Sequence, residues 1–490
     1  MSNQLSNLTN ILPYSENNSG SPSEFGSFDL VRSVEQHAST TPDKMAVSFG
    51  STGWTYRDLV AAVDRLAYRL RQEHVGRQSR VALCTPPDQH APVALLAILK
   101  LGAVYVPIGS DYPKARIQAI IDDVKPAMVL TVGGTAALFD DMPVKTGDLA
   151  TLSAPMDSPP LVAPPAEMRA EDDAYIFYTS GTTGAPKGIA VGYQALSFYI
   201  HAGIDAYGIT ADDAMLSVAK YSFSISLFEL LSPLVAGGRL MLLERDQVMV
   251  AAELTKALQQ ATVAHIGPSL LRKTLEHINN TLIEPASFDH MRHISVGGDV
   301  APPELLEGMK ETFRNADVCV IYGCTEIACM GCTYFAPRDQ AVDKTYVGKP
   351  FAGMEVLLLG EDDQPVARGD VGEVLFAGPG LLNGYINKPH LTAKKRFTLG
   401  NKTYFRTGDV GRLAPSGDLE LLGRRDFQVK VRGLRIEPVE IEVHLRRVPG
   451  VREAVVATVD GRDGEKRLAA YLVTGDQAPP TISIIRAHLA

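Results

Sequence analysis

The sequence has few cysteines, no long apolar run and no excess of basic residues, and each absence excludes a class of protein. Its five cysteines among 490 residues are too sparse, and odd in number, for a disulfide framework, so we expect reduced thiols and a cytoplasmic protein. The formal net charge of −9 argues against nucleic acid or an anionic membrane as the main partner. No apolar stretch reaches membrane-spanning length, and the N-terminus lacks the basic and apolar segments of a secretory signal.

Cysteine spacing does not predict a metal site. Cys329 and Cys332 are spaced like half of a zinc site, but no second pair follows at metal-ligand spacing and no histidine stands near. We therefore expect reduced, partly buried thiols and no zinc.

The chain is long enough for more than one domain, and its pattern changes along its length. Residues 1–26 are rich in Ser, Asn, Gly and Pro, and we expect a mobile leader. Over residues 27–424, short apolar runs alternate with helical patterns, which predicts a large α/β domain with several, mostly parallel sheets. Within it, residues 354–424 consist of short strands separated by turns, which favours a more antiparallel module. Residues 428–490 have the helix–strand–strand pattern of a small α+β domain.

A glycine-rich and hydroxyl-rich loop occurs in FYTSGTTGAPKGIAV (177–191). Its glycines allow backbone amides to approach a polyphosphate closely, and Lys187 adds a cation. The loop does not fit the pattern G-x-x-x-x-G-K-[ST], because Gly184 is followed by Ala185 and Lys187 by Gly188. It therefore predicts phosphate binding of a different kind from that of the common nucleotide-binding loop.

Eight ordered motifs resemble those of the adenylate-forming superfamily and, within it, of the adenylation domains of nonribosomal peptide synthetases. One glycine-rich loop is weak evidence, whereas eight motifs in family order over roughly residues 30–490 are specific. The motifs are TYRDL (55–59), LKLGAVYVPI (99–108), YTSGTTGAPKG (178–188), VGGD (296–299), YGCTE (322–326), GEVLFAGPGLLNGY (372–385), YFRTGD (404–409) and GRRDFQVKVRGLRIEPVEIE (423–442).

The resemblance implies an α/β fold, with a large multi-sheet N-terminal adenylate-forming domain and the start of a small mobile C-terminal α+β domain. It implies a ligase that uses ATP and Mg²⁺ to convert a small carboxylic acid into acyl-AMP, releases pyrophosphate and passes the acyl group to a thiol. The substrate carboxylate is already ionised at pH 7, so this chemistry needs positioning and charge stabilisation rather than a general base.

The resemblance also assigns roles to residues of the nucleotide site. A carboxylate suits two ribose hydroxyls because it only accepts hydrogen bonds, and a divalent ion neutralises crowded phosphate oxygens. The assigned residues are Thr179, Ser180, Gly181, Thr182, Thr183, Gly184 and Lys187 for the β- and γ-phosphates, Gly297, Gly298 and Tyr322 for adenine, Thr325 for the α-phosphate, Glu326 for Mg²⁺, Asp409 for ribose, and Arg424 for ribose or phosphate.

The substrate pocket departs from the family pattern. Amino-acid-activating relatives have a motif like F-D-x-S, whose Asp pairs with the substrate's α-ammonium, whereas KYSFSISLFELL (220–231) has Ser224 at that position. A buried ammonium without a carboxylate partner is costly, so we expect an acid without a free α-amino group: a hydroxy, keto, aryl or short acyl acid. An α-amino acid in an unusual pocket stays an alternative.

The matching positions predict the lining of the pocket, which would be mostly apolar. They are Ser224, Ile225, Phe228, His265, Ile294, Val296, Ile321, Cys329 and Met330. Tyr221, Phe223 and Phe228 could hold a betaine-like cation or a sulfonium through cation–π attraction, or could be core packing. His265 is equally compatible with a hydrogen-bonded core residue.

Residues 425–427 are the expected hinge, and Asp426 resembles the residue about which the small domain of relatives rotates. Carrier-dependent relatives commonly have Asp there, whereas coenzyme A ligases more often have Lys. The thiol is therefore expected to be the phosphopantetheine arm of a carrier protein, downstream in the same chain, with a free-standing acyl-CoA ligase and a non-catalytic ATP-binding scaffold as alternatives.

The ends of the sequence add two expectations. The family's C-terminal lysine motif is absent, because residues 476–490 end before it, so we expect a piece of a longer protein that adenylates slowly by itself. No condensation-like segment precedes the motifs, which favours an initiating module that loads an acyl starter.

Overall fold

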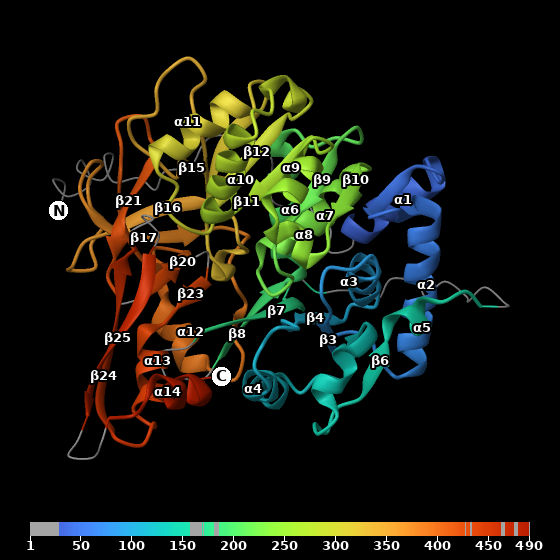
Figure 1. Cartoon of the computed structure of the whole chain (residues 1–490), viewed down its shortest axis with the longest axis horizontal. Coiled ribbons are helices and arrows are strands. Elements are labelled where there is room, and N and C mark those ends of the chain that lie inside the picture. Colours follow the sequence, from blue (N-terminus) through green and yellow to red (C-terminus); the bar gives the residue numbers. More distant parts are fainter. Residues whose placement is uncertain are drawn as a thin grey trace.

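A computed structural model of the chain describes residues 29–156, 169, 171–180, 186–426, 428–431, 434–461, 466–474 and 479–489. The predicted leader, 1–26, and the loop residues Gly181, Thr182, Thr183 and Gly184 lie outside this range. The described part of the chain forms two large sheets, a smaller third sheet and two hairpins, and strands from distant parts of the sequence meet in each large sheet (Figure 1). This is the expected α/β architecture.

A nine-stranded sheet forms the centre of the molecule. Its six inner strands run parallel, and antiparallel strands close both edges. In spatial order the strands are β15 (Lys349–Pro350), β14 (Cys332–Phe335), β13 (Asp317–Tyr322), β12 (His293–Gly297), β11 (Val263–Ile266), β9 (Ala214–Ser217), β10 (Arg239–Leu242), β1 (Met45–Phe49) and β2 (Thr52–Thr55).

A second, seven-stranded sheet is parallel except at the β7–β8 and β8–β18 pairs. Its strands in spatial order are β18 (Gly384–Tyr385), β8 (Lys187–Gly192), β7 (Asp173–Thr179), β4 (Val104–Pro107), β3 (Arg80–Cys84), β5 (Met128–Thr131) and β6 (Thr146–Asp148).

The third sheet is antiparallel, as the short strands and turns of residues 354–424 predicted. It contains β16 (Glu355–Leu359), β17 (Gly372–Ala377), β19 (Arg396–Leu399), β20 (Lys402–Leu413) and β21 (Leu419–Arg424). Two hairpins follow, β22 (Val429–Val431) with β23 (Leu434–Ile436), and β24 (Val451–Asp460) with β25 (Lys466–Thr474). In Figure 1 this C-terminal part lies on the side of the molecule opposite the first helices.

Helices pack on the large sheets and, in the C-terminal part, on the β24–β25 hairpin. They are α1 (Asp29–Thr40), α2 (Tyr56–Gln72), α3 (Ala91–Lys100), α4 (Lys114–Val124), η3 (Gly133–Phe139), α5 (Leu149–Ser153), α6 (Tyr193–Tyr207), α7 (Ile225–Ala236), α8 (Arg245–Met249), α9 (Ala251–Leu258), α10 (Pro268–Asn280), η4 (Pro285–Phe288), α11 (Pro303–Thr312), η5 (Thr325–Ile327), α12 (Pro389–Lys395), α13 (Pro438–Leu445) and α14 (Ile482–Leu489). Within the described part of the chain, no helix combines the length and apolar composition that crossing a membrane requires.

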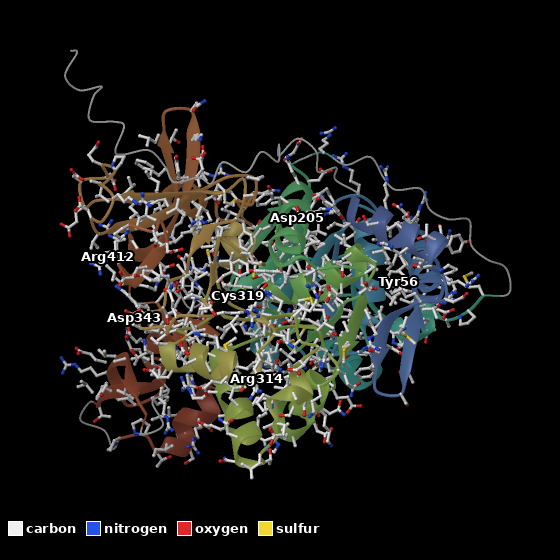
Figure 2. The ribbon with its side chains drawn as sticks, turned by 90° about the horizontal axis from the view of Figure 1, so that it is seen from above. Tyr56, Asp205, Arg314, Cys319, Asp343 and Arg412 are labelled. Atoms are coloured by element: carbon white, nitrogen blue, oxygen red, sulfur yellow. The ribbon has the colours of Figure 1, made fainter. Side chains whose placement is uncertain are left out.

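The main hydrophobic core joins the two large sheets through the helices between them. Residues of α1, α2, α3, α6 and α7 pack with residues of both sheets in one cluster. Helix α2 shows how the sequence produces this: Thr55 caps its N-terminus, and an apolar stripe at helical spacing, which includes Leu59, Leu66 and Leu70, is buried. Figure 2 shows Cys319 deep in the molecule and Tyr56 among the N-terminal helices, where the hydroxyl of Tyr56 donates to the Leu234 and Gly238 carbonyls.

A buried lysine ties three of these helices together. Lys100, 1% exposed at the end of α3, pairs with Glu35 of α1 at 2.7 Å and with Asp64 of α2. Burial alone would lower the pKa of Lys100, but the two carboxylates raise it above its ordinary value. The ion pairs of Lys100 thus join the three helices, and each charged partner stabilises the charge of the other.

Replacing Lys100 tests this junction. Lys100→Met removes the charge but keeps most of the aliphatic volume, so two carboxylates lose their cation. We expect a loss of about 3 kcal/mol in the free energy of unfolding, measured by urea titration. Lys256→Met, which removes an exposed lysine paired with Glu253, should cost about 0–1 kcal/mol. Equal losses in the two variants would contradict the assignment.

Candidate active site

The fold brings most of the predicted nucleotide-site residues to one region. Gly297 ends β12 and Tyr322 ends β13, so both lie at the carboxyl edge of the parallel strands, where ligands of open α/β sheets bind. Glu326 follows in η5, and Lys187 begins β8 of the second sheet. The third sheet adds Asp409 and Arg424, which are cross-strand neighbours on β20 and β21.

Glu326, the predicted Mg²⁺ ligand, is fully buried. The hydroxyl of Tyr385 donates to its Oε1 at 2.9 Å, and Arg435 Nη1 lies 2.7 Å from its Oε2. Burial by itself would raise the pKa of Glu326, but the charges of Arg435 and Lys187 outweigh it and lower the pKa to about 2. Glu326 is therefore an ionised carboxylate held by surrounding cations.

Lys187 is also buried and has an anionic partner. Its Nζ lies 3.3 Å from Oε1 of Glu437 and 6.0 Å from the centre of the Tyr385 ring. Burial and the nearby Arg435 lower the pKa of Lys187, while Glu326 and Glu437 act in the opposite direction. Neither Arg435 nor Glu437 was predicted as a site residue, although both lie in the quoted motif GRRDFQVKVRGLRIEPVEIE (423–442).

Asp409 and Arg424 form a second charged cluster. Asp409 accepts from the hydroxyl of Tyr322 at 2.5 Å and from Arg424 Nη1 at 2.5 Å. Arg424 also pairs with Asp426, Nε to Oδ1 at 2.6 Å. Gly408 has φ +82°, and a Cβ there would lie 2.9 Å from Arg424 Nη2, so this approach requires glycine. The predicted hinge residue Asp426 is therefore tied to the predicted nucleotide site.

Three other residues predicted to bind phosphate each have at most one side-chain hydrogen bond within the described residues. Ser180 donates to the backbone oxygen of Arg435 at 2.8 Å. The buried hydroxyl of Thr179 has no hydrogen-bond partner among the described residues. Thr325 lies 3.3 Å from Ser224, Oγ1 to Oγ, so it joins the predicted nucleotide site to the predicted substrate pocket. Gly298 has φ +83° and open space around it, which leaves room beside β12.

Ser224 lies at the N-terminus of α7 among neutral polar groups. The hydroxyl of Tyr199 donates to the Ser224 carbonyl at 3.4 Å, and the thiol of Cys329 lies close enough to the side chains of Ser224 and Tyr199 for both to influence its pKa. Burial raises the pKa of Cys329 to about 11, so the thiol is protonated at neutral pH. Tyr199 was not predicted from the sequence, because it lies 25 residues before Ser224 and carries no motif.

The loop that carries Cys329 is strained. Ala328 and Cys329 have φ +49° and +76°, and the amide of Met330 donates to the Ala328 carbonyl at 3.0 Å. A Cβ at Gly323 would lie 1.8 Å from the backbone oxygen of Cys329. A backbone held in this sparsely populated region is typical of functional sites. The loop thus holds Cys329 near Ser224.

Two predicted pocket residues lie elsewhere. Ile294 and Val296 pack in a separate core cluster with Val318 and Val320, whereas Ile321, Phe228, Tyr221 and Met330 belong to the main core, against which Ile225 packs. Because side chains alternate along a strand, the face shared with His265 presents Ser295 and Gly297 instead. The sequence held no signal for this, because only the register of β12 against β11 decides which residues share a face with His265.

Part of the predicted aromatic cage belongs to the hydrophobic core. Phe228 is 1% exposed, and its ring centre lies 6.1 Å from that of Tyr199 and 5.9 Å from that of Tyr207. His265 Nδ1 lies 3.1 Å from Oγ of Ser295, and burial lowers the pKa of His265 to about 4. At neutral pH the described pocket therefore offers no cationic histidine.

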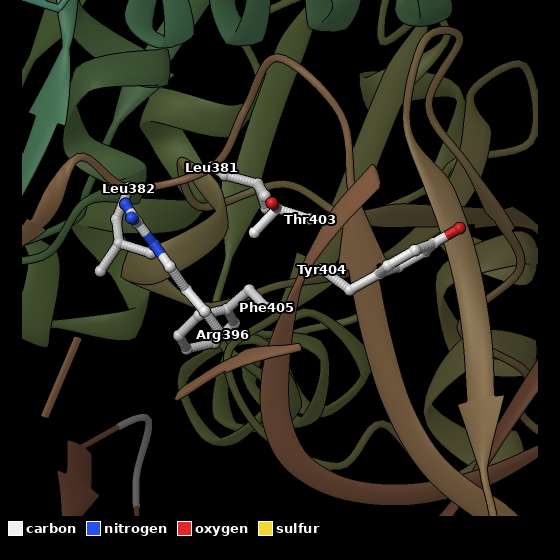
Figure 3. A pocket seen from close by; sticks show the side chains of 6 residues that line it. All are labelled: Leu381, Leu382, Arg396, Thr403, Tyr404 and Phe405. Atoms are coloured by element: carbon white, nitrogen blue, oxygen red, sulfur yellow. The ribbon is translucent and has the colours of Figure 1, made fainter. Parts of the chain in front are cut away.

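One cavity has no predicted site residue in its lining. A cavity of about 250 Å³ beside β19 and β20 is lined by Leu381, Leu382, Arg396, Thr403, Tyr404 and Phe405, none of them a predicted site residue (Figure 3).

No cluster of three or more His, Cys, Asp or Glu suited to a metal occurs in the described ranges. A single carboxylate such as Glu326 still fits Mg²⁺, which takes one or two carboxylates together with substrate phosphates and waters.

Comparison with known proteins identifies the family. The profile described as AMP-binding enzyme matches residues 34–386. The chain belongs to this family. It is thus an adenylate-forming ligase, with the adenylation domains of nonribosomal peptide synthetases among its relatives.

The curated relatives are much longer proteins. A dimodular nonribosomal peptide synthase of Bacillus subtilis (strain 168) is 32% identical over 467 residues, which cover 92% of this chain and 19% of that protein. Malpinin synthetase of Mortierella alpina is 34% identical over 475 residues, or 93% of this chain and 6% of that protein. The chain therefore spans less than a fifth of the length of either relative.

Solved structures share the fold. An artificially fused adenylation–PCP di-domain, NpsA-ThdA from Klebsiella oxytoca, has a TM-score of 0.80 at 24% identity and covers 94% of this chain and 90% of its own. The o-succinylbenzoate CoA synthetase of Bacillus subtilis has a TM-score of 0.82 at 24% identity, with coverages of 93% and 91%.

Glu229 is a buried acid beside the pocket that the sequence analysis missed. Its Oε2 accepts from Ser217 Oγ and from the amides of Val218 and Ala219 at 2.9 to 3.0 Å, while its Oε1 has no partner in the described residues. Burial raises the pKa of Glu229 from 4.5 to about 7, against the effect of these hydrogen bonds.

A pH titration of stability tests this environment. Because the folded state keeps the Glu229 proton to higher pH than the unfolded state, its contribution is complete below about pH 4.5 and is lost as the pH rises to about 7. Glu229→Gln should flatten the decline in unfolding free energy over this window, whereas Glu253→Gln on exposed α9 should not. An unchanged slope in Glu229→Gln would show that Glu229 is ionised throughout.

Proposed function

We propose that this chain activates a small carboxylic acid as an acyl-adenylate and then transfers the acyl group to the phosphopantetheine thiol of a carrier protein. The observation that carries the proposal is the convergence of Lys187, Glu326, Asp409 and Arg424 from three sheets. The peptide-synthase relatives and the adenylation–PCP di-domain support a carrier as acceptor rather than coenzyme A. The CoA synthetase with the same fold keeps coenzyme A as the alternative.

The residues present fit ATP and Mg²⁺. Glu326 would hold Mg²⁺, which supplies charge neutralisation at the phosphates. Lys187 would hold the outer phosphates, Thr325 the α-phosphate, and Asp409 the ribose. Arg424 holds Asp409 in place, 2.5 Å from Nη1 to Oδ1. These side chains align the nucleotide with the substrate carboxylate, which attacks without a base.

We infer that the substrate lacks a free α-amino group. The groups around Ser224 are hydroxyls and a protonated thiol, and a buried ammonium needs a carboxylate partner. An acid without an amine cannot itself be N-acylated, so it suits the first position of a peptide-like product, which supports a loading role. The packing of Phe228 in the core disfavours a cage for a betaine-like cation.

An α-amino acid is the second candidate substrate, and the environment of Glu229 supports it. Oε1 of Glu229 is buried without a partner in the described residues, and Glu229 lies close enough to Cys329 to influence the pKa of its thiol. An ammonium that reached Glu229 would lower the pKa of that carboxyl and ionise it.

Unreactive acyl-adenylate mimics can decide between these substrates without depending on turnover. Acyl sulfamates of adenosine would be prepared with matched α-hydroxy, α-keto, deamino, α-amino and α-trimethylammonium acids, and binding measured by calorimetry. We expect the α-hydroxy, α-keto and deamino forms to bind at least about tenfold more tightly than the α-amino and α-trimethylammonium forms, and Ser224→Asp to reverse the order for the α-amino form.

Adenosine, which lacks both the acyl group and the sulfamate, is the control, and Ser224→Asp should not change its affinity. Tightest binding of an amino form by the unchanged protein, abolished by Glu229→Gln, would replace our substrate proposal by the α-amino acid. Absence of binding by every adenosine derivative would overturn the proposed function itself.

A further inference from the structure

Three buried polar atoms in the main core have no hydrogen-bond partner among the described residues. They are the hydroxyl oxygens of Tyr105 and Tyr175 and Oε1 of Glu229, and all three residues are 0% exposed. Nearly every buried polar group in a folded protein is hydrogen-bonded, because an unpaired one bears the full cost of leaving water. If the three atoms lie together, they point to one occupant that pairs with all of them.

Tyr105 and Tyr175 project from the same face of the seven-stranded sheet. They are partners on the neighbouring parallel strands β4 and β7, and both belong to the main core cluster. The ring centre of Phe177, on the same face of β7, lies 5.3 Å from that of Tyr175 and 6.4 Å from that of Tyr105. Figure 1 shows the two strands next to each other near the centre of the molecule. The two tyrosine side chains are therefore neighbours.

Helix α7 brings Glu229 to the same part of the core. Burial raises the pKa of Tyr105, and the nearby Tyr221 raises it further. Burial also raises the pKa of Tyr221, with Glu229 among the further causes. In the same way, burial and then Cys329 raise the pKa of Tyr175, and Glu229 adds to the effect of burial on the pKa of Cys329. Tyr221 and Cys329 thus each lie near Glu229 and near one of the two tyrosines, so the three atoms surround one region.

A neutral group that both donates and accepts can satisfy all three atoms. Oε2 of Glu229 already accepts from Ser217 Oγ and from two backbone amides, and burial raises the pKa of Glu229 to about 7, so a proton on this carboxyl is carried by Oε1. Each tyrosine hydroxyl can donate and accept. An ammonium only donates, so it would leave the tyrosine protons without an acceptor. A hydroxyl group or a water molecule provides both functions.

The three atoms adjoin the predicted substrate pocket. Cys329 lies close enough to both Ser224 and Glu229 for each to influence the pKa of its thiol. Glu229 also holds the loop that leads to Ser224, because Ser217 and the two amides that follow it donate to Oε2. A substrate bound beside Ser224 can therefore extend past Cys329 toward the three atoms.

We propose that Tyr105, Tyr175 and Glu229 form a buried site for one neutral hydroxyl group. Water supplies this group in the free protein, since a buried water usually makes about three hydrogen bonds to polar groups of this kind. A hydroxyl of the substrate supplies it in the complex, and this part rests on the proposed function. The site then favours acids that carry a hydroxyl beyond the α-carbon.

Magnetic relaxation dispersion of the water oxygen counts waters held inside a protein, and it needs no ligand. The variant Tyr105→Phe/Tyr175→Phe removes both hydroxyls and keeps both rings. Since a buried water needs several polar partners, we expect about one long-lived water fewer than in the unchanged protein. The control Tyr471→Phe, at a residue that is 60% exposed, should keep the count. Either single variant, Tyr105→Phe or Tyr175→Phe, serves the same purpose if the double variant does not fold.

Matched acyl sulfamates of adenosine test the substrate as the source of the hydroxyl. The two members of each pair differ only in a terminal hydroxyl or methyl: γ-hydroxybutyryl with valeryl, δ-hydroxyvaleryl with hexanoyl, and para-hydroxyphenylacetyl with para-methylphenylacetyl. A site built to hydrogen-bond a hydroxyl rejects the analogue without it, so calorimetry should show at least about tenfold tighter binding of the hydroxyl member in one pair or more. Tyr105→Phe/Tyr175→Phe should abolish this preference, and Tyr471→Phe should retain it.

The two measurements together separate the sources of the hydroxyl group. A lower water count without a hydroxyl preference would support the site with water alone, and a preference without a lower count would support it with the substrate alone. Equal counts and no preference in any pair would overturn the site.

A cation at Glu229 would overturn the site as well. It would be revealed by α-amino acyl sulfamates that bind more tightly than the hydroxyl members, lose this affinity in Glu229→Gln and keep it in Tyr105→Phe/Tyr175→Phe. Absence of binding by every adenosine derivative would overturn the proposed function, whereas the water count would still decide whether the site exists.

Discussion

The ion pair between Arg435 and Glu326 joins two parts of the chain that meet at the candidate site. Glu326 is fully buried, so its charge is tolerated only with a cation beside it. The same constraint applies with opposite sign at Lys187, which is 6% exposed and pairs with Glu437. Loss of either partner without a replacement would leave a buried charge uncompensated in this region.

Sheet geometry explains how residues so far apart in sequence reach this region. Parallel strands bring their carboxyl ends to one edge, so Gly297 at the end of β12 pairs with Ile321, the residue before Tyr322 at the end of β13. An antiparallel pair places Asp409 directly opposite Arg424. The proposed nucleotide site thus lies where parallel and antiparallel sheets meet. The small residues Gly323 and Gly408 permit backbone approaches there that a Cβ would block.

Much of the fold and part of the site could be predicted from the sequence. Alternating short apolar runs and helical patterns predicted the two large sheets, and ordered motifs predicted the family, because both signals are local. Ile294 and Val296 were placed by motif matching and obey the two-residue period of the strand, but their side chains pack in another core, which depends on the register between strands. The leader and the centre of the glycine-rich loop lie outside the described residues, so those predictions stay predictions.

Arg435, Glu437 and Glu229 were missed for a different reason. Arg435 meets Glu326 across 109 residues of sequence, and Glu437 meets Lys187 across 250. Nothing in the local pattern of a charged motif indicates whether its charges face solvent or a buried partner of opposite sign. Similarly, the spacing of Glu229 in an apolar helix gives no information about the three donors that hold one of its oxygens.

A double-mutant cycle on the free energy of unfolding shows most directly whether Arg435 stabilises the buried charge of Glu326. The variants are Glu326→Gln, Arg435→Gln and both together, measured without nucleotide or Mg²⁺. We expect each single change to lower the free energy of unfolding. The double change should lower it by clearly less than the sum of the two single losses, which corresponds to a coupling energy of about 1–3 kcal/mol. Additive single effects would contradict it, because the two charges would then act independently.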